Sequence, residues 1–248
     1  MSDSDLAAHI GQKLAAYKPS IETIALIRET PILLLVGVSG AGKDSLKHKL
    51  LDTGRYHHIV SHTTRAPRMN GEVLEQDGRE YHFISLAEAS IMLDQYAFVE
   101  AKMYSGNIYG TSVAEIQEAH DTNKIAVTDV EVQGVAEYKG LAPDVKAIFV
   151  LPPSYDVWQD RLLSRYGDTI DDTDYAKRMA TARVELEKAL TSNYFFYLIN
   201  DQLDEAVGAV EAFMRDNTID PDAQKRARQV AEELLERLKL QMPAPPVA

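Results

Sequence analysis

The chain has 248 residues, of which 45% are hydrophobic and 26% charged, and it contains no cysteine. This length suits one α/β domain with appendages, and the lack of thiols excludes disulfides, zinc–thiolate sites and a cysteine nucleophile. The formal net charge of −12 argues against nucleic acid or an anionic membrane surface as partner. No segment has the ~20 apolar residues of a membrane span, and the acidic start differs from a signal peptide, so we expect a cytoplasmic protein.

Two helices are predicted first, over residues 3–17 and 20–29. Apolar residues recur three or four apart in both, and Lys18-Pro19 breaks between them. Ser20 stands where the second helix would begin, although the spacing of a capping box is not met. The apolar run that follows at 31–37, PILLLVG, is typical of a strand buried on both faces of a parallel sheet.

Further short apolar runs are separated mostly by helical patterns. The runs cover 57–61, 124–128, 145–151 and 195–199. The helical patterns cover 43–52, 86–94, 111–121, 131–138, 153–165, 172–192 and 202–215. Strands that alternate with helices indicate parallel βαβ units, so the predicted fold class is α/β, with a parallel sheet flanked by helices.

The end of the chain differs from this core. Residues 220–240 form a charged helical pattern with one apolar stripe, and a flexible tail is expected after it. We therefore expect a helical extension at 1–29, a core domain at 30–216, and a C-terminal helix and tail at 217–248. The apolar stripes of the extensions predict packing against the core or against a homodimer partner, and the sequence leaves both open.

A glycine-rich loop follows the strand at 31–37. Gly37, Gly42 and Lys43 fit the P-loop pattern G-x-x-x-x-G-K. In such a loop, backbone N–H groups surround phosphates at a helix N-terminus, and the lysine reaches the β- and γ-phosphates of ATP. The predicted ATP-binding residues of the loop are Gly37, Ser39, Gly40, Ala41, Gly42, Lys43, Asp44 and Ser45.

One position departs from the P-loop pattern. The residue after the lysine is normally Ser or Thr, whose hydroxyl holds Mg²⁺, and here it is Asp44. A carboxylate at this place either binds Mg²⁺ itself or repels the phosphates. Ser45 stands one residue too late to be assumed as the replacement.

Arginines gather in a second segment, SHTTRAPRMNGEVLEQDGREYHF at 61–83. Arg65 and Arg68 are separated by a proline and can point the same way, and arginine pairs with phosphate bidentately. Taken alone, the segment suits a solvated surface loop equally well. Its pattern S-x-T-T-R-x-P-R, then E-x-x-G-x-x-Y-x-F, resembles the GMP-phosphate signature of guanylate kinases. The matching residues are Ser61, Arg65, Arg68, Glu75, Tyr81 and Phe83.

This segment carries about four residues more than the family signature between Arg68 and Glu75. Glu72 therefore competes for the role of the glutamate. Glu75 is preferred, because its spacing to Gly78 and Tyr81 needs no gap.

Two later segments extend the resemblance. FVEAKMYSGNIYGTS at 98–112 is similar to the family pattern F-x-E-x-x-x-x-x-G-x-x-Y-G-[ST]. The resemblance implies that Glu100 lies near the guanine, that Tyr109 reaches the GMP phosphate, and that Thr111 or Ser112 contacts the base. A carboxylate suits guanine, whose N1–H and N2–H₂ are both donors.

The second of these segments, DVEVQG at 129–134, is similar to the family's D-x-D-x-Q-G. Asp129 follows an apolar strand and is placed like a carboxylate that positions Mg²⁺. Glu131 replaces the family aspartate that also reads guanine. The side chain of glutamate is longer than that of aspartate, so Glu131 keeps the carboxylate acceptor but places it at a different position.

Residues 149–185 resemble the family segment around a mobile lid, here about 165–178 with an acidic stretch at 168–174. The resemblance implies that Arg165 and Arg178 bridge the transferring phosphates. Arg161 precedes the lid, and Asn200 follows the last strand near the adenine. An alternative interpretation, salt-bridge partners at i,i+4 on helices, suits Arg183 and Lys188 better than these three arginines.

The resemblance covers about 31–215 and implies a P-loop kinase that phosphorylates GMP with ATP and Mg²⁺, with dGMP left open. It implies catalytic roles for Lys43, Arg65, Arg165 and Arg178. Two alternatives remain. Gly42-Lys43-Asp44-Ser45 also resembles the loop of ribose 1,5-bisphosphate phosphokinases, and Asp44 keeps open a non-catalytic binding module.

Overall fold

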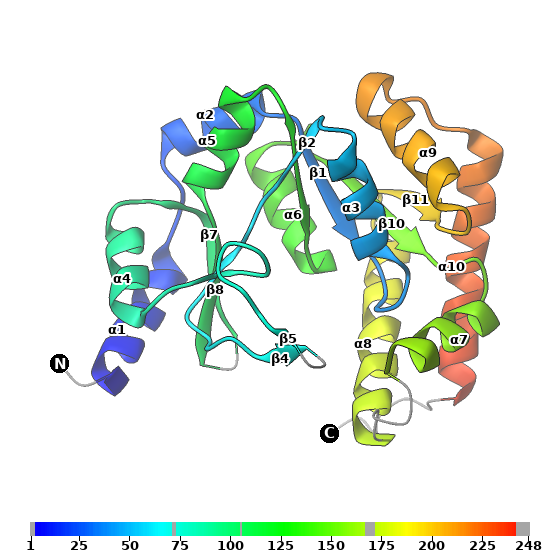
Figure 1. The fold of residues 1–248 in the computed structure, drawn as a ribbon, viewed down its shortest axis with the longest axis horizontal. Helices are drawn as coiled ribbons and strands as arrows, with labels where there is room; N and C mark the ends of the chain where they lie inside the picture. Colours follow the sequence, from blue (N-terminus) through cyan, green and yellow to red (C-terminus); the bar gives the residue numbers. More distant parts are fainter. Residues whose placement is uncertain (1–2, 71–72, 105, 167–171, 242–248) are drawn as a thin grey trace. The chain divides into compact units, whose positions relative to one another are not determined.

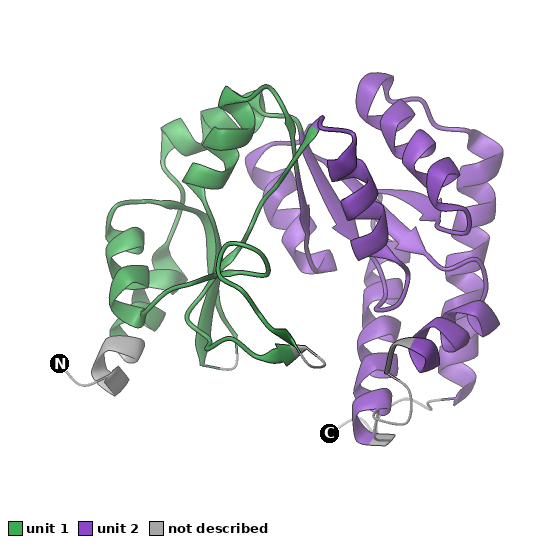
Figure 2. Ribbon diagram, in the orientation of Figure 1, with its two compact units in different colours: residues 1–31, 56–126 green, residues 32–55, 127–248 purple. Residues whose placement is uncertain are grey.

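The computed structural model describes residues 3–70, 73–104, 106–166 and 172–241. These residues divide into two compact units, coloured separately in Figure 2. Unit 1 comprises residues 1–31 and 56–126, and unit 2 comprises residues 32–55 and 127–248. Each unit is considered by itself below.

The larger sheet has five strands in the order β11-β10-β1-β9-β2. The pairs β1–β10 and β10–β11 are parallel, and every residue of β1 is buried. The two-sided central strand and the parallel α/β core that the sequence predicts are therefore confirmed. The strands are β1 (Ile32–Val36), β2 (Tyr56–His58), β9 (Ile125–Asp129), β10 (Lys146–Leu151) and β11 (Phe195–Ile199).

The helices of unit 2 lie near their predicted positions (Figure 1). Among their contacts, α3 packs against α9, α6 packs against α8, and α9 packs against β11. None of the helices in the described part of the chain is long and apolar enough to cross a lipid bilayer. The bounds are α3 (Lys43–Asp52), α6 (Val132–Leu141), α7 (Tyr155–Tyr166), α8 (Asp172–Thr191), α9 (Leu203–Asp216) and α10 (Pro221–Gln241).

The C-terminal helix α10 packs against α7, α8, β10 and β11. Leu234, Leu235 and Leu238 of its apolar stripe are buried within the chain. Gln224 Oε1 accepts a hydrogen bond of 3.0 Å from the backbone N–H of Tyr197, in the edge strand β11. Of the two arrangements left open by the sequence, the stripe of α10 adopts packing against the core.

Unit 1 contains a second sheet, in the order β6-β3-β8-β7, which the sequence does not predict. The pairs β7–β8 and β3–β8 are antiparallel, and β3–β6 is parallel. Two of these strands have only two residues each, too few to show the alternation by which strands are recognised. Besides β2, which pairs in the larger sheet, the strands that lie wholly in unit 1 are β3 (His62–Thr63), β4 (Met69–Asn70), β5 (Val73–Leu74), β6 (His82–Phe83), β7 (Phe98–Tyr104) and β8 (Asn107–Ser112).

The helices of unit 1 are α1 (Asp3–Ala16), α2 (Ile21–Glu29), α4 (Leu86–Asp94) and α5 (Val113–Asp121). Ser20 caps α2 as predicted, because its side chain accepts a hydrogen bond from Thr23 N. Ser85 and Glu88 form a full capping box at the start of α4. The packing of α1 against α4 and β7 joins the N-terminal extension to the second sheet.

Candidate active site

A loop rich in glycine joins β1 to α3. Gly37, Gly40 and Gly42 have φ angles of 136°, 84° and 88°, which residues with a Cβ rarely adopt. A Cβ at Gly37 would collide with the carbonyl of Val150, and one at Gly42 would collide with the side-chain amide of Asn200. Glycine is therefore required here both by backbone conformation and by space.

Side chains from distant parts of unit 2 hold this loop. Trp158 Nε1 donates to Ser39 O at 2.7 Å. Asn200 Nδ2 donates to the carbonyl of Ala41 at 3.1 Å and to the next carbonyl at 3.2 Å. Arg161 Nη1 donates to Asn200 O at 3.0 Å. The structure thus joins Arg161 and Asn200 to the predicted ATP loop, and it adds Trp158, which no sequence motif singled out.

A cavity of about 910 Å³ lies over the loop within unit 2. The N-terminus of α3, at Lys43, borders it and supplies the positive end of a helix dipole. The side chains that line the cavity include both positive and negative charges. The cavity therefore suits an anion that binds together with a cation. The charged lining residues are Lys43, Asp44, Arg161, Asp174, Lys177, Arg178, Glu185 and Asp201.

Lys43 lies at the loop itself. Its ammonium group donates to the carbonyl of Gly37 and, at 3.3 Å, to that of Val38. Burial raises the pKa of Glu185 to about 7, while Lys43 opposes this shift and Glu131 adds to it. Lys43 and Glu185 both line the cavity, a proximity that the sequence motifs do not indicate.

Asp129, at the end of β9, forms an ion pair with the buried Lys47 of α3. Its second oxygen, Oδ1, is buried and has no hydrogen-bond partner in the described part of the chain. Such an oxygen suits a metal ion or a metal-bound water. The described residues contain no ready-made cluster of three or more His, Asp or Glu. Mg²⁺ commonly binds one or two carboxylates, waters and substrate phosphates, so Asp129 and Asp44 fit this ion.

Only part of the expected lid belongs to the described residues. Arg178 of α8 lines the cavity, together with Asp174 and Lys177. Arg165 belongs to the last turn of α7, and its side chain lies outside the described part. The predicted acidic stretch at 168–174 falls mostly outside it as well, because residues 167–171 are not described.

Unit 1 carries the predicted arginine site. Arg65 forms two hydrogen bonds with Glu75, at 2.8 and 3.0 Å, and only 8% of Arg65 is exposed. Glu75 also accepts from the backbone N–H of Arg68 at 2.7 Å. Hydrogen bonds from Arg65 and from the Arg68 backbone lower the pKa of Glu75. Glu75 thus holds both arginine positions, whereas Glu72 lies outside the described residues.

Two tyrosines complete this cluster. The Arg65 guanidinium lies 5.3 Å from the ring centre of Tyr81, and the rings of Tyr81 and Tyr109 are 5.9 Å apart. Burial raises the pKa of Tyr81. The hydrogen bonds of Arg65 with Glu75, and then with Tyr109, raise the pKa of the guanidinium above its ordinary value. The fixed cation beside two phenol groups can bind a phosphate. Ser61 lies next to β3 and accepts from His82 N through its backbone carbonyl.

Glu100 and Thr111 are cross-strand neighbours on β7 and β8. Thr111 N donates to Glu100 Oε1 at 3.2 Å, and Thr111 is buried. The predicted residues of unit 1 are therefore gathered on one sheet and its connections. Glu131, in contrast, belongs to unit 2, where it stands at the N-cap position of α6 without a capping side-chain hydrogen bond and accepts a hydrogen bond from Gln133 Nε2.

Comparison with known proteins places the chain in a family. A family model described as guanylate kinase matches residues 29–217. A guanylate kinase of Schizosaccharomyces pombe is 36% identical over 183 residues, covering 73% of this chain and 88% of the relative. Those of Sus scrofa and Homo sapiens are both 37% identical; they cover 72% and 70% of this chain, and 89% and 87% of their own lengths.

A solved structure shares the fold. The crystal structure of guanylate kinase from Anaplasma phagocytophilum aligns with a TM-score of 0.53 and 21% identity, over 84% of this chain and 94% of that one. The family model, the curated relatives and the α/β fold agree with the motifs found in both units. The chain belongs to the guanylate kinase family.

Proposed function

We propose that this protein transfers the terminal phosphoryl group of ATP to the phosphate of GMP. One observation carries the proposal: the same chain has a phosphate loop with its lysine and a built Arg65–Glu75–Tyr81–Tyr109 cluster. The first suits the donor and the second suits the phosphate of the acceptor. The reaction needs alignment and neutralisation of charge rather than a covalent intermediate.

On the donor side, ATP binds in the cavity of unit 2. Backbone N–H groups of the loop from Gly37 to Ser45 surround its phosphates, and Lys43 leaves the loop carbonyls to contact the β- and γ-phosphates. Arg178, which belongs to α8, neutralises the negative charge of the phosphoryl group during its transfer, and Arg165 acts together with it. Asn200 and Arg161 act by holding the loop in shape.

Asp44 and Asp129 hold Mg²⁺ in this proposal. When bound, the ion neutralises charge between the β- and γ-phosphates. Asp44 stands in the first turn of α3 and lines the cavity, and Asp129 offers a buried oxygen. Lys47 compensates part of the negative charge that these two carboxylates bring.

On the acceptor side, Arg65, Arg68, Tyr81 and Tyr109 hold the GMP phosphate, with Ser61 beside them. Glu75 fixes the arginines, because it already binds the side chain of one and the backbone of the other. The base is read by Glu100, Thr111 and Glu131 through the donors on the guanine edge. No general base is needed, since the GMP phosphate is anionic at neutral pH.

The catalytic domain spans 30–216, with the GMP region at about 61–112 and the lid at about 165–178, flanked by extensions at 1–29 and 217–248. A cytoplasmic location and no nucleic-acid partner are expected from the composition. A homodimer through the terminal helices stays a prediction, although the apolar stripe of α10 is already buried within the chain.

Asp44 favours one second candidate, a kinase for another phosphorylated acceptor such as ribose 1,5-bisphosphate. A coupled assay of ADP formation from Mg²⁺–ATP separates the two, with GMP, dGMP, AMP, UMP and ribose 1,5-bisphosphate offered in parallel. Turnover with GMP, alone or with dGMP, supports the proposal. Turnover with ribose 1,5-bisphosphate alone assigns the second candidate, and turnover with none assigns a binding module.

A further inference from the structure

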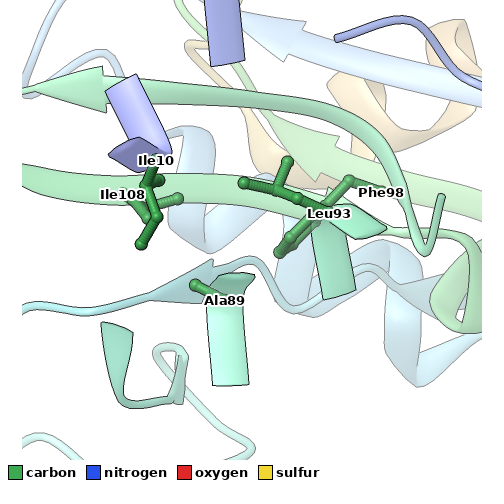
Figure 3. Packing of buried hydrophobic residues seen from close by; sticks show 5 residues of the cluster. All are labelled: Ile10, Ala89, Leu93, Phe98 and Ile108. Carbon is green, nitrogen blue, oxygen red and sulfur yellow. The ribbon is translucent and has the colours of Figure 1, made fainter. Parts of the chain in front are cut away.

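The N-terminal extension shares a hydrophobic core with the strands of the predicted guanine site. Ile10 of α1 is fully buried in a cluster with Ala89, Leu93, Phe98 and Ile108, shown in Figure 3. These residues come from α1, α4, β7 and β8. The helix α1 lies outside residues 29–217, which match the family model. The N-terminal extension, which lies outside the family domain, therefore helps to support β7, the strand that carries Glu100.

The hydroxyl of Tyr17, just after α1, binds both backbone groups of one residue of β7. It donates to Phe98 O at 2.6 Å and accepts from Phe98 N at 3.1 Å. Phe98 pairs with Ser112, and Glu100 pairs with Thr111. The pairing therefore advances by two residues along β7 while it advances by one residue along β8. This is a β-bulge, at which the strand bends and its side chains are redirected.

Further contacts join α1 and the residue Tyr17 after it to the end of α4 and to the connection that leads into β7. Lys13 Nζ donates to both carboxylate oxygens of Asp94, the last residue of α4, at 2.6 and 2.8 Å. The ring of Tyr17 stacks on that of Tyr96 with centroids 6.2 Å apart. Burial raises the pKa of Tyr17, so its hydroxyl stays protonated and able to donate.

The strands leave little room beside Glu100. A Cβ at Gly110 of β8 would lie 2.8 Å from Glu100 O and 2.9 Å from the Phe98 ring. The two strands are therefore closely packed beside Glu100 and leave little free space in which a change at the bulge could be absorbed. The carboxylate of Glu100 is in turn fixed by Thr111 N at 3.2 Å.

We propose that Tyr17 is a positioning residue for guanine recognition: by holding the bulge at Phe98, it sets where β7 presents Glu100. The inference rests on the proposed function, because it takes Glu100 as a reader of the base. It gives the extension a role in substrate selection beyond its contribution to the core.

Tyr17→Phe tests this role, because it removes the hydroxyl and keeps the ring. GMP is compared with inosine monophosphate (IMP), which lacks the N2 amino group of guanine. We expect the KM for GMP to rise about threefold to tenfold, with kcat and the KM for ATP within about twofold. The GMP/IMP ratio of kcat/KM should also fall, by a smaller factor, because IMP keeps the N1–H donor and lacks only the N2 amino group. A smaller folded fraction would lower the kcat/KM values for GMP and IMP by the same factor and leave their ratio unchanged.

Two controls sharpen the result. Tyr96→Phe removes a hydroxyl from the neighbouring stacked ring and should leave the KM for GMP within about twofold. In a Glu100→Ala background, Tyr17→Phe should have no further effect on the GMP/IMP ratio, because its effect acts through Glu100. An unchanged ratio in the single variant, or an equal fall in the Glu100→Ala background, overturns the inference.

Calorimetric Kd values for GMP separate this inference from the proposed function. A wild type that binds GMP without phosphorylating it removes the proposed function alone, and a Kd raised by Tyr17→Phe still supports the role of Tyr17. A Kd that Tyr17→Phe leaves unchanged overturns that role. A wild type that neither binds nor phosphorylates GMP overturns both.

Discussion

Lys47 of α3 is paired with Asp129 of β9, although the two residues stand 82 positions apart in the chain. The side chain of Lys47 is 11% exposed and that of Asp129 is 30% exposed. The pair lies next to the phosphate loop, since α3 begins at Lys43. The ammonium group of Lys47 thus lies beside Asp129, one of the two carboxylates that we assign to Mg²⁺.

Lys47→Met should lower the free energy of unfolding by about 1–3 kcal/mol in EDTA, because a partly buried carboxylate loses its partner. Mg²⁺–ATP should restore part of this loss if Asp129 binds the ion. Urea denaturation with and without Mg²⁺–ATP measures both effects. Lys49→Met is the matched control, since Lys49 of the same helix pairs with an exposed Asp204. An equal loss in both variants would remove the special role of Lys47.

Glu185 predicts a pH dependence of stability. Burial raises its pKa from the ordinary value of 4.5 to about 7 in the folded protein. Between these two values the folded protein holds a proton that the unfolded chain has released, so this site loses stability as pH rises through the window. Relative to Glu185→Gln, the wild type should become less stable by roughly 2–3 kcal/mol between pH 4.5 and pH 8.

Urea denaturation of the wild type and the Gln variant at pH 5 and at pH 8 checks this expectation. Glu88→Gln is the control. The backbone hydrogen bond at Ser85 lowers the pKa of Glu88, so its contribution is lost only as pH falls below the ordinary value of 4.5, and the difference between wild type and Glu88→Gln should stay nearly constant between pH 5 and pH 8. A difference between wild type and Glu185→Gln that does not change with pH would contradict a buried, titrating carboxyl.

The sequence predicts the elements whose pattern is local. The bounds of α3 and α4 are correct to the residue, because both helices begin at clear signals: a P-loop and a capping box. The strand β1 is recognised because both of its faces are buried. The sheet of unit 1 is missed, since β3 and β6 are too short for periodicity and the second half of β7 is exposed.

The features of the candidate site also divide into those that the sequence predicts and those that it does not. Residues that carry motifs, such as Lys43, Arg65 and Glu75, could be named from their spacing in the sequence. The contacts that hold them in place could not. Trp158 binds the loop at Ser39 from 119 positions away, and no local pattern encodes such a contact. Tertiary packing decides which polar side chains meet, and a single sequence does not contain it.

Substitutions of Asn200 test how the phosphate loop is supported, without changing a residue that we assign to phosphoryl transfer. Its amide donates to two loop carbonyls and is buried, so Asn200→Asp would place an acceptor against acceptors. We expect the KM for ATP to rise more than about tenfold for Asn200→Asp and less for Asn200→Ala. The KM for GMP should change little in either variant. The reverse order of the two variants would mean that the side-chain amide does not support the loop.

Lys43→Ala and Glu75→Gln separate donor from acceptor. Lys43→Ala should lower kcat by orders of magnitude, because the lysine neutralises the transferring phosphoryl group. Glu75→Gln keeps the shape of the side chain but replaces one carboxylate oxygen by an NH₂ donor, so it can keep at most one of the two hydrogen bonds that hold Arg65, at 2.8 and 3.0 Å. It should raise the KM for GMP about tenfold, with the KM for ATP nearly unchanged.

Initial-rate kinetics with each substrate varied in turn measures both changes. Glu80→Gln is the matched control for Glu75, since the side chain of Glu80 binds the exposed Arg79 and the backbone N–H of Gln76 rather than an assigned arginine. If Glu75→Gln raised both Michaelis constants alike, Glu75 would support the fold rather than the arginines. An effect on GMP alone means that the bond between Glu75 and Arg65 exists to hold a phosphate site, because a purely structural ion pair has no reason to distinguish the two nucleotides.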